Sequence, residues 1–143
     1  MDAVSPHNGV FLDAANARFS TGFPAEVGFH FLEWQEGRAV LGLNIDARHL
    51  NLANVIHGGV LATLMDVAGA CAGTWNADPR SIRKAVTLSM TTTFTGQASD
   101  GLIRCIGTRR AGGSRIYNRT MEVFDEHDNL LAMGEATFRL RST

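Results

Sequence analysis

The sequence is poor in several features that would define its class at once. Its 143 residues include two cysteines and three prolines, and its formal net charge is −1. Two cysteines are too few for the disulfide framework of a small secreted domain, so we expect Cys71 and Cys105 to be reduced and buried. A net charge near zero gives no general attraction to nucleic acid or to an anionic membrane surface.

Long hydrophobic runs are also missing. No apolar run approaches the ~20 residues of a membrane span, and Asp2 stands early in a segment without the apolar stretch of a secretion signal. These features predict a cytoplasmic protein. The length predicts a single domain, and an apolar fraction of 45% with a charged fraction of 19% is ordinary for a globular chain.

Hydrophobic periodicity divides the first third of the chain into a helix and a hairpin. Residues 8 to 18 carry a helical pattern that Asn8 would cap, and residues 21 to 24 break it. We therefore assign residues 1–24 to an N-terminal segment with a short helix, and residues 25–143 to the main domain. Residues 26–34 and 38–46 alternate apolar and polar side chains around Gly37, which predicts a β-hairpin.

Residues 59 to 75 form the one long helical pattern. Its apolar face would pack on a core and consists of Leu61, Leu64, Met65, Ala68, Cys71, Ala72 and Trp75. The other face has small residues around a single carboxylate: Ala62, Asp66, Gly69, Ala70 and Gly73. Because glycine inside a helix costs about 1 kcal/mol relative to alanine, the two glycines predict close approach by another backbone or a ligand.

The remainder of the chain has the pattern of long strands. Residues 85–94, 102–110, 116–124 and 130–141 are separated by turn signals at 96–101, 112–113 and 126–129. Consecutive long strands predict an antiparallel sheet, and the apolar helix before them would cover its inner face. The predicted class is therefore α+β.

The run from Asn51 to Asp66 carries the most chemistry. Gly58 and Gly59 allow a ligand to approach the backbone closely, and the first amides of the following helix can donate to an oxygen where the helix dipole favours negative charge. Asp66, two turns further on, is the only acidic residue between Asp46 and Asp78. A polarising amide and a lone carboxylate are the groups needed to attack an acyl carbon.

This run resembles the signature of the hotdog-fold acyl-CoA thioesterases, in particular the branch related to phenylacetic-acid degradation thioesterases. The matching residues are Asn51, the His57-Gly58-Gly59 triplet and Asp66. A weaker resemblance in the strands extends it over roughly residues 25 to 141. Asn54 stands where a glycine is common in the family. The resemblance implies a single hotdog domain, in which a long antiparallel sheet wraps around one central helix.

The resemblance also implies a role for each signature residue. Asp66 would attack the thioester carbon or activate a water, and the Gly58 amide would polarise the thioester oxygen. Asn51 would hold the loop or bond the substrate, and His57 would order the loop. Thr87 stands where some relatives place a hydroxyl that orients the attacking water; an ordinary strand threonine is the alternative.

The same resemblance implies the partners. The family pairs two subunits along their sheets, so that Asp66 of one chain faces the Asn51 and Gly58 loop of its partner in a homodimer or homotetramer. Coenzyme A belongs to the substrate, and no separate cofactor is expected.

A basic stretch offers a place for the phosphates of coenzyme A. Residues 101 to 121 contain no acid but five arginines, and guanidinium groups bind phosphate well. A solvated sheet surface is the alternative. The candidate substrate-binding residues are Gly59 together with Arg109, Arg110, Gly112, Ser114 and Arg115. A second candidate group consists of Arg80, Arg83 and Lys84.

Two other functions are the alternatives to thioester hydrolysis. A hotdog hydratase or dehydratase needs a histidine and a carboxylate placed for proton abstraction, and a non-catalytic acyl-CoA-binding protein needs neither. The five histidines are scattered without ligand spacing, so no metal is expected.

The small residues around Asp66 leave room for an aryl or medium-chain acyl group, whose far end Phe11, Phe19 and Phe23 would close.

Overall fold

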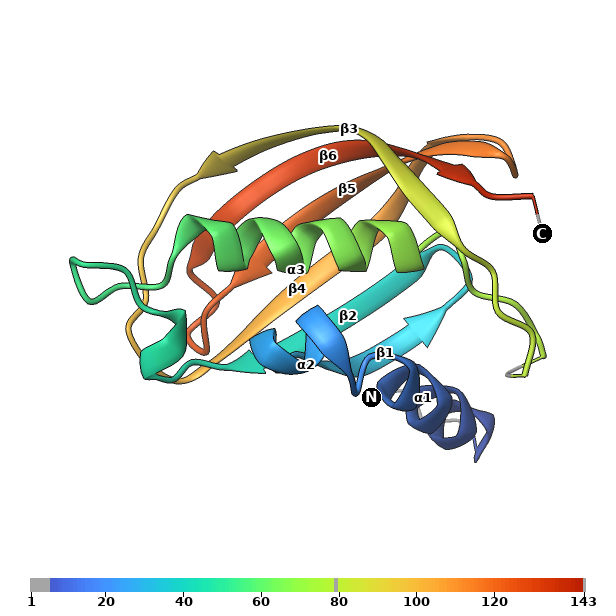
Figure 1. Cartoon of the computed structure of the whole chain (residues 1–143). Coiled ribbons are helices and arrows are strands. Elements are labelled where there is room, and N and C mark those ends of the chain that lie inside the picture. Colours follow the sequence, from blue (N-terminus) through green and yellow to red (C-terminus); the bar gives the residue numbers. More distant parts are fainter. Residues whose placement is uncertain (1–5, 79, 143) are drawn as a thin grey trace.

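A long curved sheet wraps around one helix (Figure 1). The computed structural model describes residues 6–78 and 80–142, and within them the side chains from residue 12 onward. The elements in chain order are α1 (Pro6–Arg18), α2 (Gly22–Val27), β1 (His30–Gln35), β2 (Arg38–Asn44), a 3-10 turn η1 (Ala47–His49), α3 (Gly58–Cys71), β3 (Ala85–Phe94), β4 (Leu102–Gly112), β5 (Ile116–Phe124) and β6 (Leu130–Leu140).

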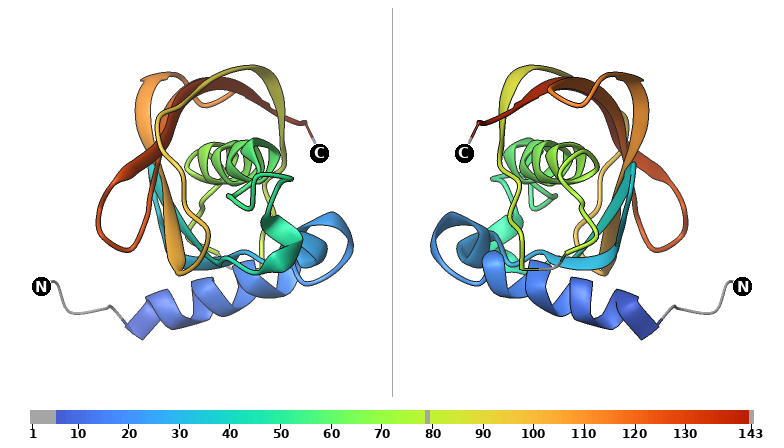
Figure 2. Two further views of the ribbon diagram at one scale, coloured as in Figure 1. Left: turned by 90° about the vertical axis from the view of Figure 1, so that its left-hand side faces the viewer. Right: turned by 90° about the vertical axis from the view of Figure 1, so that its right-hand side faces the viewer.

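The sheet has six strands in the order β1-β2-β4-β5-β6-β3, and every neighbouring pair is antiparallel. β3 follows α3 in the chain but lies at the edge of the sheet beside β6. The next strand, β4, lies beside β2, so β3 and β4 are not neighbours in the sheet. The end-on views place α3 inside the curve of the sheet, while α1 lies outside it (Figure 2). The predicted α+β arrangement of a sheet wrapped around a central helix is confirmed.

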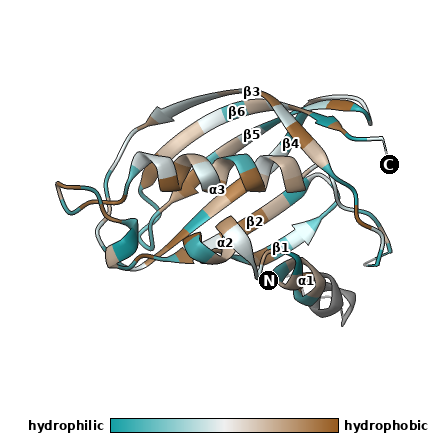
Figure 3. Ribbon diagram, in the orientation of Figure 1, coloured by the Kyte–Doolittle hydropathy of each residue, from teal (hydrophilic) through white to brown (hydrophobic). Residues whose placement is uncertain are grey.

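The apolar face of α3 holds the helix in the sheet. Leu61, Leu64, Met65 and Ala68 are buried, as the periodicity predicted. The approach is close, because a Cβ on Gly107 of β4 would lie 2.5 Å from the Ala68 carbonyl oxygen. Figure 3 shows that α3 is mainly apolar, with a short hydrophilic segment in its second half. Within residues 6–78 and 80–142, no helix is long and apolar enough to cross a membrane.

Both thiols are buried and free, as predicted. Cys71 lies at the end of α3 and Cys105 lies in β4. Burial raises the pKa of the Cys105 thiol well above its usual range.

A bulge in β3 turns two side chains toward the same helix. The pairing of β3 with β6 is irregular between Thr87 and Ser89. In a regular strand, residues 87 and 94 would point to opposite faces. Here the Thr87 hydroxyl bonds to Asp66 of α3, and the Phe94 ring lies against Gly58 at the start of α3. The extra residue therefore changes the alternation of the strand, which is the usual effect of a bulge.

The start of the predicted hairpin is wrong. Residues 22–27 form α2, and β1 begins only at His30. Pro24 is compatible with the first turn of a helix, where its missing N–H is not needed. Gly28 then ends α2 in the left-handed conformation, with φ 86°, and donates its N–H to the Pro24 carbonyl. α1 begins at Pro6 rather than Asn8, and α3 ends at Cys71 rather than residue 75.

Gly69 and Gly73 are approached closely by side chains of the sheet, whereas the sequence left another backbone or a ligand as the alternatives. A Cβ on Gly69 would lie 2.9 Å from the Met121 sulfur and from the Phe138 ring. A Cβ on Gly73, just past the helix, would overlap the ring of Tyr117. The space beside both glycines is therefore filled by the sheet, and the helix lacks side chains there so that it can pack.

Gly73→Ala is expected to lower the free energy of unfolding by about 1–3 kcal/mol, because the added methyl group overpacks the site of the buried Tyr117 ring. Gly113→Ala is the matched control, since a Cβ there meets no atom within 4 Å. Urea unfolding followed by circular dichroism measures both variants. Equal stability of the two variants would contradict the packing role of Gly73.

Candidate active site

The loop before α3 is held by its own asparagines. The Asn51 side-chain oxygen accepts hydrogen bonds from the Ala53 N–H at 2.9 Å and the Val55 N–H at 3.3 Å. The Asn51 N–H in turn donates to the Val55 carbonyl at 2.9 Å. Asn54 has φ 60°, a conformation that asparagine tolerates better than most residues. Asn54 thus serves where the family commonly has glycine, and Asn51 holds the loop.

His57 caps the N-terminus of α3. Its backbone is extended, with φ −67° and ψ 134°, and its Nδ1 accepts the Gly59 N–H at 2.9 Å. Its carbonyl accepts the N–H groups of Val60 and Leu61 at 3.0 and 3.3 Å. A side-chain acceptor at this position satisfies one of the first helical amides. The geometry therefore gives His57 a loop-ordering role.

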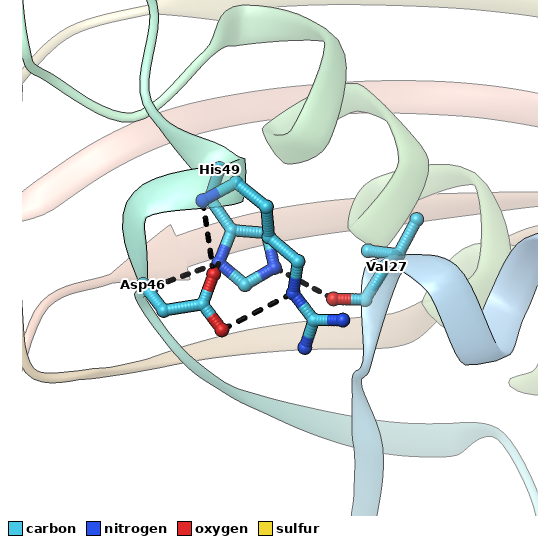
Figure 4. A network of polar contacts seen from close by, with 4 residues as sticks. Val27, Asp46 and His49 are labelled. Carbon is cyan, nitrogen blue, oxygen red and sulfur yellow. Dashed lines mark hydrogen bonds and ion pairs between the residues drawn. The ribbon is translucent and has the colours of Figure 1, made fainter.

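His49 supports this turn from behind, and sequence reasoning gave it no role. The ring is 2% exposed. Nδ1 accepts the Asp46 N–H at 3.0 Å, and Nε2 lies 2.6 Å from the Val27 carbonyl oxygen (Figure 4). With Nδ1 as an acceptor, the proton lies on Nε2 and is donated to Val27. The His49 carbonyl accepts the His57 N–H at 2.8 Å, so the ring ties α2 to the start of α3. The Asp46-x-x-His49 spacing of a capping box was the available signal.

The Gly58 amide is the open donor of this helix end. Among the described residues, its N–H donates no hydrogen bond. Gly58 lines an open groove with Asn51 and with Phe94 of β3. An added Cβ would be 3.5 Å from the Phe94 ring. The N–H is therefore available to an oxygen that enters the groove.

Asp66 and Thr87 form a pair eight residues further along α3 than Gly58. The Thr87 hydroxyl donates to Asp66 Oδ1 at 2.5 Å, which is the short length typical of a bond to a carboxylate. Because Oδ1 is occupied by this bond, the geometry leaves Oδ2 available for chemistry.

A cavity of about 530 Å³ opens beside this pair. Its apolar wall includes Phe19, Trp34, Val67, Ala70 and Ile82, and its charged members other than Asp66 are Arg18, Arg83, Lys84 and Arg141.

The cavity walls correct the predicted phenylalanine closure in part. Phe19 lines the cavity and packs on Phe29 and Phe31, with ring centroids 5.6 and 5.4 Å apart. Phe23 is 66% exposed and lies outside the cavity wall. The Phe11 side chain lies outside the described part of the chain.

Cys71 also lines this cavity but is unsuited to act as a nucleophile. Burial raises the pKa of its thiol to about 12, so the thiol stays protonated near neutral pH. Its carbonyl accepts the Trp34 indole N–H at 2.7 Å. Cys71 is thus part of the cavity wall, and among the described residues Asp66 is the only carboxylate that lines the cavity.

The predicted phosphate-binding arginines lie at the same end of the molecule as this cavity. Arg109 is 3.5 Å from Glu36 and lines a smaller cavity of about 140 Å³ with Ser114 and Arg83. Arg110 and Arg115 are exposed. Arg83 of the second predicted group lines both cavities, which brings it beside Arg109 and Ser114 of the first group, whereas Arg80 pairs with Asp78 at 3.3 Å.

Arg119, from the same basic stretch, has a structural position. It is 5% exposed, lies over the Tyr117 ring at 4.6 Å and donates to the Ala72 carbonyl at 3.3 Å. Burial lowers the pKa of its guanidinium. A cation is favourable at this point because Ala72 is the C-cap of α3.

Comparison with known proteins defines the family. The sequence profile of the Thioesterase superfamily matches residues 53–132, so the chain belongs to that superfamily. A curated protein of Archaeoglobus fulgidus with the provisional name of an esterase is 28% identical over 107 residues, which are 74% of this chain and 66% of that protein. The chain thus spans slightly less than two thirds of that relative.

Two solved structures share the architecture. A phenylacetic acid degradation protein PaaI of Thermus thermophilus, solved as a mutant, is 27% identical, with a TM-score of 0.70 over 84% of this chain and 98% of that one. A thioesterase of Haemophilus influenzae is 17% identical, with a TM-score of 0.81 over 99% and 93% of the two chains. The fold is the hotdog fold that the signature implied.

His57→Asn is expected to retain most of the turnover, because asparagine is an equally good helix cap and the geometry gives the ring a structural task. His57→Ala should lower the free energy of unfolding by about 1 kcal/mol through loss of the cap. Steady-state turnover and urea unfolding are measured for both variants. A large loss of turnover in His57→Asn at unchanged stability would show that the imidazole itself transfers a proton.

Proposed function

We propose that the protein hydrolyses acyl-CoA thioesters, with Asp66 of one chain and the Gly58 amide of a second copy acting on one acyl carbon. The observation that carries the proposal is the Thr87–Asp66 hydrogen bond at the rim of an apolar cavity. Membership in the Thioesterase superfamily supports thioesters as the class of substrate.

The reaction needs one carboxylate and one oxyanion donor. In the general-base form, Asp66 Oδ2 takes a proton from water, and the water oxygen forms a bond to the acyl carbon. The Gly58 N–H stabilises the developing oxyanion. The carbon–sulfur bond then breaks and the thiolate of coenzyme A leaves. A thiolate is a good leaving group, so no general acid is required. In the nucleophilic form, Oδ2 itself attacks and water hydrolyses the resulting anhydride.

Both forms require a second chain. Gly58 and Asp66 are eight residues apart on one helix, which separates them by about 12 Å along the axis at ~1.5 Å per residue. A single acyl carbon cannot contact both groups at that separation. Two copies of α3 that run antiparallel about a two-fold axis near Ala62 bring each Gly58 to the Asp66 of the other copy.

The edge of the sheet supports pairing of two copies. β3 is a ten-residue edge strand, and within residues 6–78 and 80–142 no strand pairs with its outer side. It exposes Val86, Leu88 and Phe94 to between 37% and 53%. A long edge strand with unpaired backbone groups and exposed apolar side chains invites pairing with another chain. Because β3 also carries Thr87, pairing there places the partner beside the Asp66 cavity.

The cavity favours an apolar acyl group. Its walls are mostly apolar, and its volume of about 530 Å³ falls within the usual range for small-molecule sites. We propose aryl or medium-chain acyl groups, because each buried methylene contributes about 0.8 kcal/mol.

Asp66→Asn is expected to lower kcat at least ~100-fold while the fold is retained, because the substitution keeps the shape but removes the nucleophile or base. Release of coenzyme A from a panel of acyl-CoAs is measured with a thiol reagent. The matched control is Asp13→Asn, an exposed aspartate of α1, which should turn over normally.

The same assay separates the alternatives. A hydratase converts an enoyl-CoA without releasing thiol, and a non-catalytic binding protein releases none from any acyl-CoA. Near-native thiol release by Asp66→Asn would contradict the catalytic role proposed for the carboxylate.

The basic end of the molecule is the proposed site for the phosphates of coenzyme A. No acidic group forms an ion pair with Arg83, Lys84, Arg110, Arg115 or Arg141 in the described part of the chain. The Leu140 N–H donates to the Arg115 carbonyl at 2.7 Å, and the Arg141 N–H donates to the Lys84 carbonyl at 2.8 Å. These backbone bonds hold the chain segments of the region together at the rim of the Asp66 cavity.

Arg83→Gln and Arg115→Gln are expected to raise KM for an acyl-CoA more than they lower kcat. The increase should shrink at high salt, because exposed charges are screened within about a Debye length. The N-acetylcysteamine thioester of the same acid lacks the phosphates and should react equally with native and variant proteins. Arg104→Gln, whose native side chain pairs with Asp128 at 2.7 Å, is the control. An equal loss on both substrates would remove these arginines from phosphate binding.

A further inference from the structure

We infer that Leu52 reaches across the dimer and forms part of the wall of the partner subunit's acyl cavity. The inference rests on the proposed function for its two-fold arrangement and adds a residue that sets the choice of acyl group. Leu52 is 105% exposed, so the fold of its own chain covers none of it.

The loop that carries Leu52 is held by hydrogen bonds within itself. Its neighbour Asn51 bonds to Ala53 and Val55 through the side chain, and Asn54 donates its N–H to the Asn51 carbonyl at 2.9 Å. Leu50 and Ile56 close the base of the loop as an isolated antiparallel bridge. A leucine held in water by a fixed loop gains nothing from burial within its own chain. Its whole side chain is therefore available to bury apolar area against a second chain.

The two-fold arrangement identifies that surface. The loop projects beyond the N-terminus of α3, roughly along the line of the helix (Figure 1). When Gly58 of one chain meets Asp66 of the other, residues that precede Gly58 lie beside the partner at positions beyond its Asp66. The Asp66 cavity extends in that direction, along Ala70 to Thr74 and across to Ile82.

The chemistry of the two surfaces matches. The cavity has an apolar wall that includes Val67 and Ile82, and Ile82 is itself 51% exposed in the single chain. Leu52 would bury its side chain against this wall and narrow the open side of the cavity. The residue would then touch the distal part of a medium-chain acyl group, whereas an acetyl group is too short to reach it.

Leu52→Ala is expected to lower kcat/KM about tenfold for octanoyl-CoA, given the methylenes removed. It should leave kcat/KM for acetyl-CoA within about twofold. Phe23→Ala, which removes another exposed apolar side chain outside the cavity wall, should change neither value. An equal loss on both substrates would overturn the inference, because it would mean that Leu52 only supports the loop.

A mixed dimer decides whether Leu52 acts across the interface. One chain carries Asp66→Asn with native Leu52, and the other carries native Asp66 with Leu52→Ala. The two chains bear different affinity tags, so that the heterodimer is purified in two steps. Its only working site combines native Asp66 with the native Leu52 of the other chain. The inference predicts the native ratio of octanoyl-CoA to acetyl-CoA rates; the Leu52→Ala ratio would overturn it.

A structural readout separates this inference from the proposed function. A photoreactive benzoylphenylalanine at position 52 should crosslink to residues 66–85 of a second chain, identified by mass spectrometry after isolation of the dimer band. This crosslink in a protein that hydrolyses no acyl-CoA would support the contact and reject the function. Crosslinks only within one chain, in a protein that hydrolyses acyl-CoAs, would reject the contact and leave the function standing.

Discussion

The structure depends on the burial of α3 within the curve of the sheet. That one helix fills the core through Leu61, Leu64 and Met65, and it also carries both groups of the candidate site. Because a helix is rigid, the separation of Gly58 and Asp66 is fixed by the number of residues between them. The helix that stabilises the fold by packing on the sheet therefore also keeps Gly58 and Asp66 of one chain apart.

The ends of the helix are held by different means. At the N-terminus, His57 caps the helix and His49 ties the turn to α2, which leaves the Gly58 amide open. At the C-terminus, the Trp34 indole binds the Cys71 carbonyl and Arg119 binds the Ala72 carbonyl. Donors are thus satisfied at one end except where a substrate oxygen is proposed to bind, and acceptors at the other end are occupied by side chains.

Much of the fold followed from the sequence, because periodicity reports burial directly. The strands from Ala85 to Leu140 and the core face of α3 were predicted within a few residues. α2 was missed because Pro24 was read as a break rather than as a first-turn residue. The inward orientation of both Thr87 and Phe94 depends on a bulge, which strict alternation cannot reveal.

The candidate site was predictable only where spacing determines position. Asp66, Gly58 and Gly59 lie in α3 and His57 is its N-cap, so their spacing along the chain determines their relative positions. Close approach at Gly69 and Gly73 was predicted, but not what approaches, because a small residue leaves space without indicating what fills it; here side chains of the sheet fill it. His49 escaped notice because its hydrogen bond to the Val27 carbonyl joins segments that are 22 residues apart, although its local bond to Asp46 has the spacing of a capping box.

The most direct test mixes two inactive variants. Gly58 is the first helical residue and His57 is extended, so Gly58→Pro removes the N–H without breaking the helix. Gly58→Ala keeps the N–H and is the control. Gly58→Pro and Asp66→Asn should each be inactive alone. Unfolded and refolded together, they should recover about a quarter of the native turnover, because half of the dimers are mixed and each has one complete site. A mixture that forms heterodimers and stays inactive would contradict a site shared between two chains.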